Sequence, residues 1–335
     1  MRRYEVQERF GLDHLRIAAR PEPALGPGQV RVMVRACSLN YRDLLMVRGH
    51  YDPRLPLPLV PLSDGVGEVL ELGPGVQRVA LGQRVIATFA PTWIAGEPDG
   101  DAVRLTRGGA VPGMLSEQVV LGEGELVPVP AHLTDAEAAT LPCAALTAWS
   151  ALVTYGGLKA GDTVLTLGTG GVSVFALQIA RLLGARVIAT TSSEAKAQRL
   201  RELGAGEVLL YPQEPRWGRA VRRQTGGVDH VVEVGGAGTL AESLEAVRPG
   251  GTVSLIGVLA GVREPLTVLP VLMKQVRVQG ILVGHRQGLE ALCRAVDLHA
   301  LRPVVDQVFP FAEVPAAFAH LASGQHVGKV CVEVG

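Results

Sequence analysis

Hydrophobic and polar positions follow two different patterns along this chain. Up to about Pro130, short apolar runs are separated by turns rich in Gly and Pro, which is typical of β structure. The runs predict strands at 30–35, 65–72, 84–88 and 117–121, a short helix at 41–47, and a loop over 91–112. This part of the chain is therefore expected to form an irregular, mostly β domain.

From about Thr134, apolar runs of four to six residues alternate with segments of helical period. The runs predict strands at 163–167, 186–190, 208–210, 230–234, 252–256 and 278–283, with helices at 172–183, 194–203 and 240–247. Strands covered by helices on both faces are parallel, so we expect an α/β fold with a doubly wound sheet of six strands. Helices near 287–299 and 315–322 and a strand at 329–334 follow.

Composition narrows the function classes. The 335 residues favour two domains, and 32 basic against 32 acidic residues give no electrostatic reason to bind nucleic acid or an anionic membrane. The apolar stretch at 172–188 is interrupted by Gln178, Arg181 and Arg186, so we expect no membrane span, and the N-terminus lacks the apolar core of a secretory signal. Four widely spaced Cys indicate free thiols and a cytoplasmic location.

The stretch "TVLTLGTGGVSVFALQIARLLGA" has the order strand, glycine turn, helix. Its glycines allow a sharp turn and a close approach of the backbone to a phosphate, and the helix N-terminus favours a pyrophosphate. Ser173 stands where a third glycine is usual. In this context the turn predicts dinucleotide binding, with these candidate residues: Gly168, Thr169, Gly170, Gly171 and Val172.

The end of the second predicted strand, "ATTSSEAK", bears on which cofactor binds. Neutral donors and a cation there suit a 2′-phosphate, so we expect NADP(H), while Glu194 leaves NAD(H) open. Ser193 and Glu194 also fit a plain helix start, with Ser193 as N-cap. The candidates at this edge are Thr191, Ser192, Lys196 and Tyr211; those after later strands, through backbone groups, are Gly235, Gly257, Val258 and Val283.

Several stretches together resemble the medium-chain dehydrogenase/reductase superfamily, which holds the zinc alcohol dehydrogenases and their quinone oxidoreductase relatives. They are "VRACSLNYRDLLMVRGHY", "PLSDGVGEVLELGPGV", "ATLPCAALTAWSAL", the glycine-turn stretch, "VRPGGTVSLIG" and "GKVCVEV". The resemblance implies a GroES-like β-rich catalytic domain at 1–131 plus 287–335 and a Rossmann domain at 132–286. It also implies a homodimer formed by pairing the sixth strands.

In zinc-dependent relatives, three motif positions hold catalytic zinc, and here they are Asn40, Ser63 and Cys143. Only the thiol is a good ligand, whereas catalytic zinc needs three. No Cys lies at 91–110, where relatives carry a structural zinc lobe. We therefore expect no zinc, as in the quinone oxidoreductase branch, with a replacement site of Cys37, His50 and Cys143 as the alternative.

Without a Lewis acid, the easier task is hydride transfer from NADPH to a quinone, enone or related carbonyl, in which charge is delocalised. We expect Asn40 or Tyr41 to hold the substrate carbonyl. Asp64 either lines the site or pairs with an Arg, and Arg42 and Asp43 are expected to form an ion pair that stabilises the short helix. An alcohol or aldehyde dehydrogenase that uses a proton relay or a non-standard zinc site is the alternative function.

The remaining candidates come from the same resemblance, each with a plainer alternative. Cys143 is also interpretable as an ordinary buried residue and Tyr51 as plain packing. Lys329 resembles a terminal Lys that lies near the cofactor in relatives, and a surface charge is the alternative. The candidates for the substrate pocket are Tyr51, Ser63 and Cys143; those for the cofactor are Thr147 and Lys329.

Overall fold

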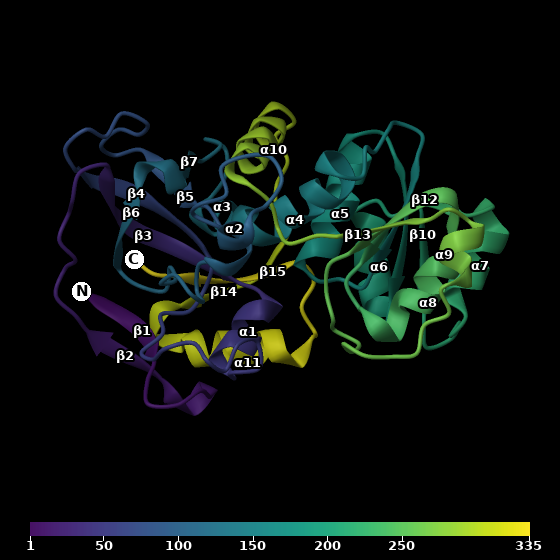
Figure 1. Ribbon diagram of the computed structural model, residues 1–335, viewed down its shortest axis with the longest axis horizontal. Helices are drawn as coiled ribbons and strands as arrows, with labels where there is room; N and C mark the ends of the chain where they lie inside the picture. Colours follow the sequence, from purple (N-terminus) through teal and green to yellow (C-terminus); the bar gives the residue numbers. More distant parts are fainter. The chain divides into compact units, whose positions relative to one another are not determined.

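The computed structural model describes residues 1–335, and the chain divides into two compact units (Figure 1). The first unit comprises Met1–Leu146 and Gly284–Gly335, and the second comprises Thr147–Val283. A β-rich domain interrupted by a doubly wound domain was predicted. The division falls at 146/147 and 283/284, however, and not at 131/132 and 286/287.

The first unit is built on a seven-stranded sheet with the order β14-β15-β3-β4-β5-β7, in which β6 pairs with β3. The strands are β3 (Gln29–Leu39), β4 (Asp64–Leu72), β5 (Arg84–Ala87), β6 (Gln118–Gly122), β7 (Leu126–Pro128), β14 (Val305–Pro310) and β15 (Lys329–Glu333). Every second residue along the first half of β3 is buried, from Val30 through Val32 to Val34, so one face of the sheet packs into the core.

A separate hairpin and several helices complete the first unit. They are β1 (Arg2–Val6), β2 (Leu15–Ala19), α1 (Tyr41–Val47), α2 (Gly100–Arg104), α10 (Arg286–Leu298) and α11 (Val314–Ser323). Helix α1 has the predicted bounds. Helix α2 lies within the segment expected to be a loop, so that expectation was wrong over five residues.

Three strand ends meet in this sheet. β15 runs antiparallel to β3 with Val330 opposite Leu39, and β4 runs antiparallel to β3 with Asp64 opposite Ser38. The start of β15, the end of β3 and the start of β4 therefore lie side by side. This register brings together residues from the two ends of the sequence.

The second unit is a six-stranded parallel sheet with the order β10-β9-β8-β11-β12-β13, which is the predicted doubly wound arrangement. Its strands are β8 (Thr163–Leu167), β9 (Arg186–Thr191), β10 (Glu207–Leu210), β11 (Val228–Glu233), β12 (Val247–Leu255) and β13 (Arg277–Gly280). Its helices are α5 (Gly171–Leu182), α6 (Glu194–Glu202), α7 (Trp217–Thr225), α8 (Ala237–Ala246) and α9 (Leu269–Met273). The last strand is shorter than the predicted 278–283, and Val283 lies beyond it.

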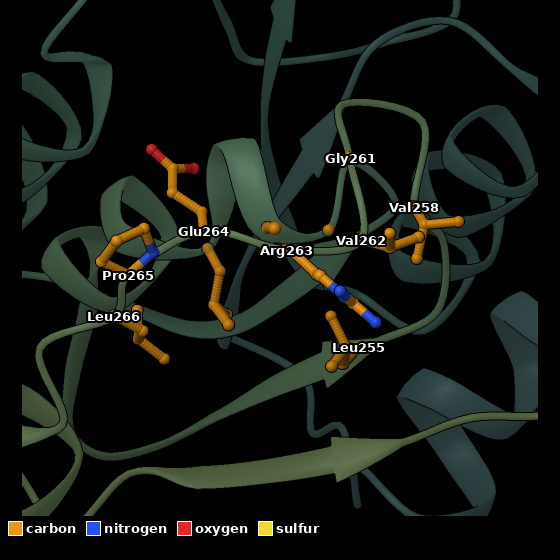
Figure 2. A pocket seen from close by; sticks show the side chains of 11 residues that line it. Leu255, Val258, Gly261, Val262, Arg263, Glu264, Pro265 and Leu266 are labelled. Carbon is orange, nitrogen blue, oxygen red and sulfur yellow. The ribbon is translucent and has the colours of Figure 1, made fainter.

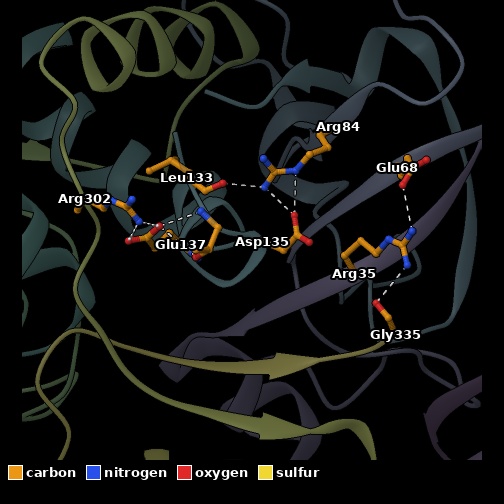
Figure 3. Close-up of polar contacts among 9 residues, drawn as sticks. Arg35, Glu68, Arg84, Leu133, Asp135, Glu137, Arg302 and Gly335 are labelled. Carbon is orange, nitrogen blue, oxygen red and sulfur yellow. Dashed lines mark hydrogen bonds and ion pairs between the residues drawn. The ribbon is translucent and has the colours of Figure 1, made fainter. Parts of the chain in front are cut away.

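The position of the first boundary is explained by a helical segment that the sequence pattern did not reveal. It begins with α3 (Asp135–Ala138), and α4 (Leu146–Trp149) lies between two π-helical turns, Leu141–Ala145 and Ser150–Thr154. Figure 3 shows how its start is fixed: Arg84 of β5 donates to Asp135 Oδ1 and to Leu133 O, and Arg302 donates to Glu137. Residues 132–146 therefore belong to the first unit.

The same segment, Asp135–Thr154, is the one helix whose length and hydropathy would allow it to cross a membrane. Within the fold, 72% of its apolar window is buried. An apolar helix that is mostly covered by its own protein is a usual core element.

Candidate active site

Helix α1 begins at the end of β3, and Asn40 is the residue that joins them. Asn40 has an extended backbone, its N–H donates to Asp43 Oδ2 at 2.8 Å, and its C=O accepts from the Asp43 N–H at 2.9 Å. These reciprocal bonds satisfy backbone groups at the helix start, which stabilises a helix N-terminus. The position of Tyr41, the first helical residue, is set by them.

The Asn40 side chain lies where the three strand ends meet. Its Oδ1 accepts from Lys329 Nζ at 2.5 Å. Its Nδ2 donates to Asp64 Oδ2 at 2.9 Å and to Ser63 Oγ at 3.4 Å, and Ser63 Oγ donates to Asp64 Oδ1 at 2.9 Å. We call Asn40, Ser63, Asp64 and Lys329 the polar cluster. The structure thus brings together four of the predicted site residues.

The charges of the polar cluster are buried. Asp64 is 0% exposed and Lys329 is 3% exposed, and Lys329 Nζ lies 3.9 Å from Asp64 Oδ2. Burial raises the pKa of Asp64 to about 6, against the opposing effects of the Lys329 charge and of hydrogen bonds from Asn40 and Ser63. Asp64 pairs with a Lys and not with an Arg, and the interpretation of Lys329 as a surface charge was wrong.

The expected ion pair between Arg42 and Asp43 is present, but hydrogen bonds of Arg42 go to other residues. Their closest nitrogen and oxygen atoms are 3.9 Å apart, while the Arg42 guanidinium donates to Arg107 O at 2.8 Å and to Thr106 Oγ1 at 2.7 Å. The same guanidinium lies over the rings of Tyr51 and Phe89, 5.2 and 4.8 Å from their centroids. Arg42 therefore anchors the loop at 105–107. The half-exposed ring of Tyr51 packs against the same guanidinium group.

The alternative zinc site is wrong. Cys37 is buried and donates to Met114 O at 3.2 Å, Cys143 is buried, and His50 is exposed. No group of three or more His, Cys, Asp or Glu residues could hold a metal ion. Burial, with the Asp64 charge adding to it, raises the pKa of the Cys143 thiol far above neutral pH.

The donor set at the motif positions does not fit zinc. Asn40 contributes an amide that already bonds an ammonium group, Ser63 contributes a hydroxyl that already bonds a carboxylate, and Cys143 contributes a neutral thiol. Catalytic zinc takes three strong nitrogen, sulfur or carboxylate ligands, and ligating Cys is deprotonated.

In the second unit, the predicted turn connects β8 to α5. Gly168 has a φ of +74°, which favours glycine, and Gly170 is the N-cap of the 12-residue helix α5. Ser173 Oγ donates to Leu167 O at 2.6 Å, so the residue in place of the third glycine bonds the helix to the strand end. The turn, comprising Gly168, Thr169, Gly170, Gly171 and Val172, leaves the helix N-terminus available for an anion.

The end of β9 carries the neutral side chains on which the NADP(H) prediction rests. Thr191 is buried and Ser192 is exposed, and the Tyr211 N–H donates to Thr191 O at 3.1 Å, which places Tyr211 beside this strand end. Ser193 is the N-cap of α6, as the plainer interpretation held. The Glu194 carboxylate accepts from Arg201 at 2.5 Å, so its charge is paired within the helix.

Sequence reasoning missed a buried carboxylate at the end of β11. Glu233 is fully buried and accepts hydrogen bonds from Gly235 N–H, Gly236 N–H and the hydroxyls of Thr239 and Ser243. The Gly235 C=O accepts from the Ala260 N–H, so both backbone groups of Gly235 are engaged within the unit. The stretch "VEVGG" spans the end of β11 and the turn that follows it. No sequence pattern indicated that Glu233 would bond this turn.

A cavity of about 610 Å³ lies at the carboxyl ends of β11 and β12 (Figure 2). Of the predicted residues Val258 lines it, and Figure 2 shows the Arg263 side chain lying toward Leu255 while Glu264 points the other way. The loop at 261–266 has no hydrophobic period, so nothing in the sequence indicated this wall. Val283, also predicted, has a φ of +49°, a strained conformation for a β-branched residue.

Comparisons with known proteins agree with this geometry. Residues 26–131 match the "Alcohol dehydrogenase GroES-like domain" and residues 171–297 match the "Zinc-binding dehydrogenase" family. A "Zinc-type alcohol dehydrogenase-like protein" of Schizosaccharomyces pombe is 38% identical over 99% of both chains. The chain belongs to the medium-chain dehydrogenase/reductase superfamily. The predicted GroES-like and Rossmann-type folds are thereby confirmed.

Two further relatives extend the comparison. The crystal structure of a "putative Alcohol dehydrogenase" from Sinorhizobium meliloti is 46% identical with a TM-score of 0.92, covering 99% of this chain and 98% of that one. An "Acryloyl-coenzyme A reductase" of Metallosphaera sedula is 31% identical, covering 92% of this chain and 93% of its own length. This medium-chain dehydrogenase/reductase is an NAD(P)H-dependent oxidoreductase.

Proposed function

We propose that the protein is a zinc-independent oxidoreductase that transfers hydride from NADPH to a quinone, an enone or a related carbonyl compound. The observation that carries this proposal is the composition of the polar cluster. An amide, a hydroxyl, a carboxyl and a buried ammonium group hydrogen-bond one another where zinc-dependent relatives place their ligands. In such a site, hydrogen-bond donors polarise the substrate carbonyl in place of a metal ion.

A conjugated acceptor suits such a site. Reduction of an isolated carbonyl concentrates negative charge on one oxygen, whereas an enone or a quinone spreads it over several atoms, so a neutral donor suffices. The relative named as an acryloyl-coenzyme A reductase supports this choice, because acryloyl is a conjugated acyl group. Bound NADPH supplies the hydride, and solvent supplies the proton that completes the reduction.

The proposed roles follow the two units. In the first unit, Asn40 or Tyr41 holds the substrate carbonyl, Asp64 organises these donors, and the pocket walls are Tyr51, Ser63 and Cys143. In the second unit, Thr147 and the backbone near Gly257, Val258 and Val283 hold the nicotinamide end. The strain at Val283 supports a functional role, because strained residues persist where the surrounding fold requires them.

We further propose NADP(H) as the preferred cofactor. Thr191 and Ser192 are neutral donors at the end of β9, Lys196 adds a cation, and Glu194 is paired with Arg201 and so repels a 2′-phosphate less. Tyr211 lies beside the same strand end and offers its ring to the adenosine. The pyrophosphate is assigned to the turn at 168–172.

A second candidate, alcohol or aldehyde oxidation through a proton relay, has one observation in its favour. The Ser63 hydroxyl donates to a carboxyl whose pKa is raised to about 6, and such a pair accepts a proton from an alcohol at neutral pH. The sequence shared with proteins named alcohol dehydrogenase supports this candidate as well.

We also propose a homodimer that acts on a small molecule in a reducing cytoplasm. β13 is the edge strand of its sheet, and Val278 on it and Leu272 and Met273 before it are exposed. Paired edges in a dimer would cover this surface. Four buried free thiols suit a reducing compartment.

The deciding experiment measures turnover with NADPH and with NADH against panels of quinones, enones, aldehydes and alcohols, together with the zinc content of the purified protein. We expect quinone or enone reduction with NADPH and less than about 0.1 zinc per subunit, since structural and catalytic zinc sites bind stoichiometrically. Turnover confined to alcohols and aldehydes would favour the relay. Stoichiometric zinc whose removal abolishes activity would overturn both.

A further inference from the structure

The hydrogen-bonding capacity of Asn40 is fully used within the protein. An Asn residue has a backbone donor and acceptor, a side-chain oxygen and two amide hydrogens. In Asn40 the backbone pair bonds Asp43, the oxygen bonds Lys329, and the two amide hydrogens face Asp64 and Ser63. No donor remains for a substrate carbonyl.

Lys329 determines which way this amide faces. An ammonium group only donates, and a carboxylate only accepts, so Oδ1 must face Lys329 and Nδ2 must face Asp64. Lys329 Nζ also donates to Leu39 O at 2.6 Å. The ammonium thus holds the last two residues before helix α1, Leu39 and Asn40, from the opposite end of the sequence.

Tyr41 follows these two residues directly, and its environment is the reverse of that of Asn40. Its side chain is 42% exposed, and no hydrogen bond involves its phenol. A phenol hydroxyl is a good donor to a developing oxyanion because its ordinary pKa is about 10. Of the two residues proposed to hold the carbonyl, Tyr41 alone has a donor available.

We propose that Lys329 is a positioning residue that acts through Asn40, and that Tyr41 is the donor to the substrate carbonyl. The proposal rests on the proposed reductase function for the part concerning Tyr41. It also replaces the expected contact between Lys329 and the cofactor. Two of the three ammonium hydrogens are used by Leu39 and Asn40, the group is buried, and the nearest remaining acceptor is Asp64 at 3.9 Å.

The orientation can be tested without any assay of activity. Asn40 is the only Asn among the 335 residues, so protein labelled with ¹⁵N in Asn side chains gives one pair of amide proton signals. We expect both signals to exchange slowly with solvent in the wild type, because both hydrogens are bonded within the protein. Lys329→Met should speed exchange of these hydrogens with solvent at least about tenfold, because the amide loses the donor that orients it. The two signals stay separate in either protein, since rotation about the amide C–N bond is slow.

Two variants control that measurement. Lys159→Met removes an exposed Lys from the second unit and should leave the Asn40 signals unchanged. Lys329→Arg keeps a charged donor and should retain slow exchange, and it serves as the test if Lys329→Met does not fold. Fast exchange in the wild type, or equally slow exchange in folded Lys329→Met, would overturn the positioning role.

Kinetics then test the connection to Tyr41. Removing a preorganised donor costs about 100-fold in kcat, so Tyr41→Phe should show a loss of that order. Lys329→Met should lower kcat about tenfold and leave the Kd of NADPH within about twofold, as expected for a residue that does not touch the cofactor. Because both changes affect the same donor, the double variant should be no slower than Tyr41→Phe alone.

The outcomes separate the two proposals. Multiplied losses in the double variant, or a Kd of NADPH raised about tenfold by Lys329→Met, would show that Lys329 acts elsewhere. A wild-type protein that reduces no acceptor would refute the proposed function. The signals of Asn40 would still decide whether Lys329 orients the amide.

Discussion

The cofactor turn and the polar cluster show two ways of building a site. The turn at 168–172 lies on one continuous stretch, and its geometry follows from glycines, a helix start and the Ser173 hydroxyl. The polar cluster joins residues that are 24 and 289 positions apart, through the pairing of β3 with β4 and β15. The first site depends on local conformation, whereas the second depends on the whole first unit being folded.

The two sites also differ in electrostatics. The turn relies on backbone donors and a helix N-terminus, which do not titrate. The polar cluster contains a buried ammonium and a buried carboxyl, each of which would be costly alone. Substitutions in the polar cluster should therefore lower the stability of the protein most. Substitutions around the turn should change the choice of cofactor or lower the stability only slightly.

The largest expected effect comes from removing the carboxyl of the cluster. Asp64→Ala leaves the Lys329 ammonium buried without its counter-charge, and breaking a buried pair in this way costs about 3–5 kcal/mol. Urea unfolding should show the loss as a lower midpoint. Asp101→Ala, which removes an exposed carboxylate, is the control and should change the midpoint little.

The second prediction concerns pH. The folded-state pKa of Asp64 is raised to about 6 from 3.8, so the folded state binds more protons than the unfolded state between these values. Stability contributed by protonated Asp64 is therefore complete below about pH 4 and is lost as the pH rises toward about 6, by roughly 3 kcal/mol in all. The contribution is measured as the difference in unfolding free energy between wild type and Asp64→Asn across this range.

A difference that stays constant from pH 4 to 7 would contradict the raised pKa. Glu5, whose pKa is lowered to about 2 chiefly by hydrogen bonds from Arg20, is present in both proteins, so its contribution cancels in the difference. Asp43, whose pKa is also raised by burial, remains in both proteins, and its charge adds to the raised pKa of Asp64.

The third prediction concerns the cofactor edge of the second unit. Lys196→Ala should weaken NADPH binding by about 2 kcal/mol, near 30-fold, since a hydrogen bond to a charged group is worth about 1.5–3 kcal/mol. NADH binding should change little. Fluorescence titration with both cofactors checks this, and equal losses for the two would show that Lys196 does not meet the 2′-phosphate.

The smallest expected effect concerns the turn itself. Ser173→Ala removes the hydrogen bond to Leu167 O and should cost about 1 kcal/mol of stability with the parallel sheet intact. Ser173→Gly restores the usual third glycine and should cost somewhat more, because glycine adds about 1 kcal/mol of conformational entropy in a helix. Thermal unfolding of the two variants would order these effects.

The comparison explains how much could be predicted from the sequence. Helix α1 and strand β8 have the predicted bounds, and the turn at 168–172 was found, because each is specified by residues close in sequence. Lys329 was interpreted as a surface or cofactor residue, because its burial arises from the pairing of β15 with β3. Whether the Asn40 side chain is free to bond a substrate likewise depends on Lys329 and Asp64, which are distant in sequence.

The helical segment at 135–154 was missed for a different reason. Its two π-helical turns shift the hydrophobic residues away from a period of 3.6, and nearly every position from Ala138 to Leu152 is buried. A segment without a polar face gives no amphipathic signal. The apparent domain boundary was therefore placed before this segment, at Ala131.

The pairing of β15 with β3 has a consequence for synthesis of the protein on the ribosome. The second unit is continuous in sequence, so all of its strands have been made before β15 exists. Until β15 emerges, the nascent first unit has Asn40 and Asp64 on adjacent strand ends but lacks the lysine that bonds Asn40 and pairs with Asp64. The order of translation therefore lets the nucleotide-binding half mature first and delays completion of the half that carries the polar cluster.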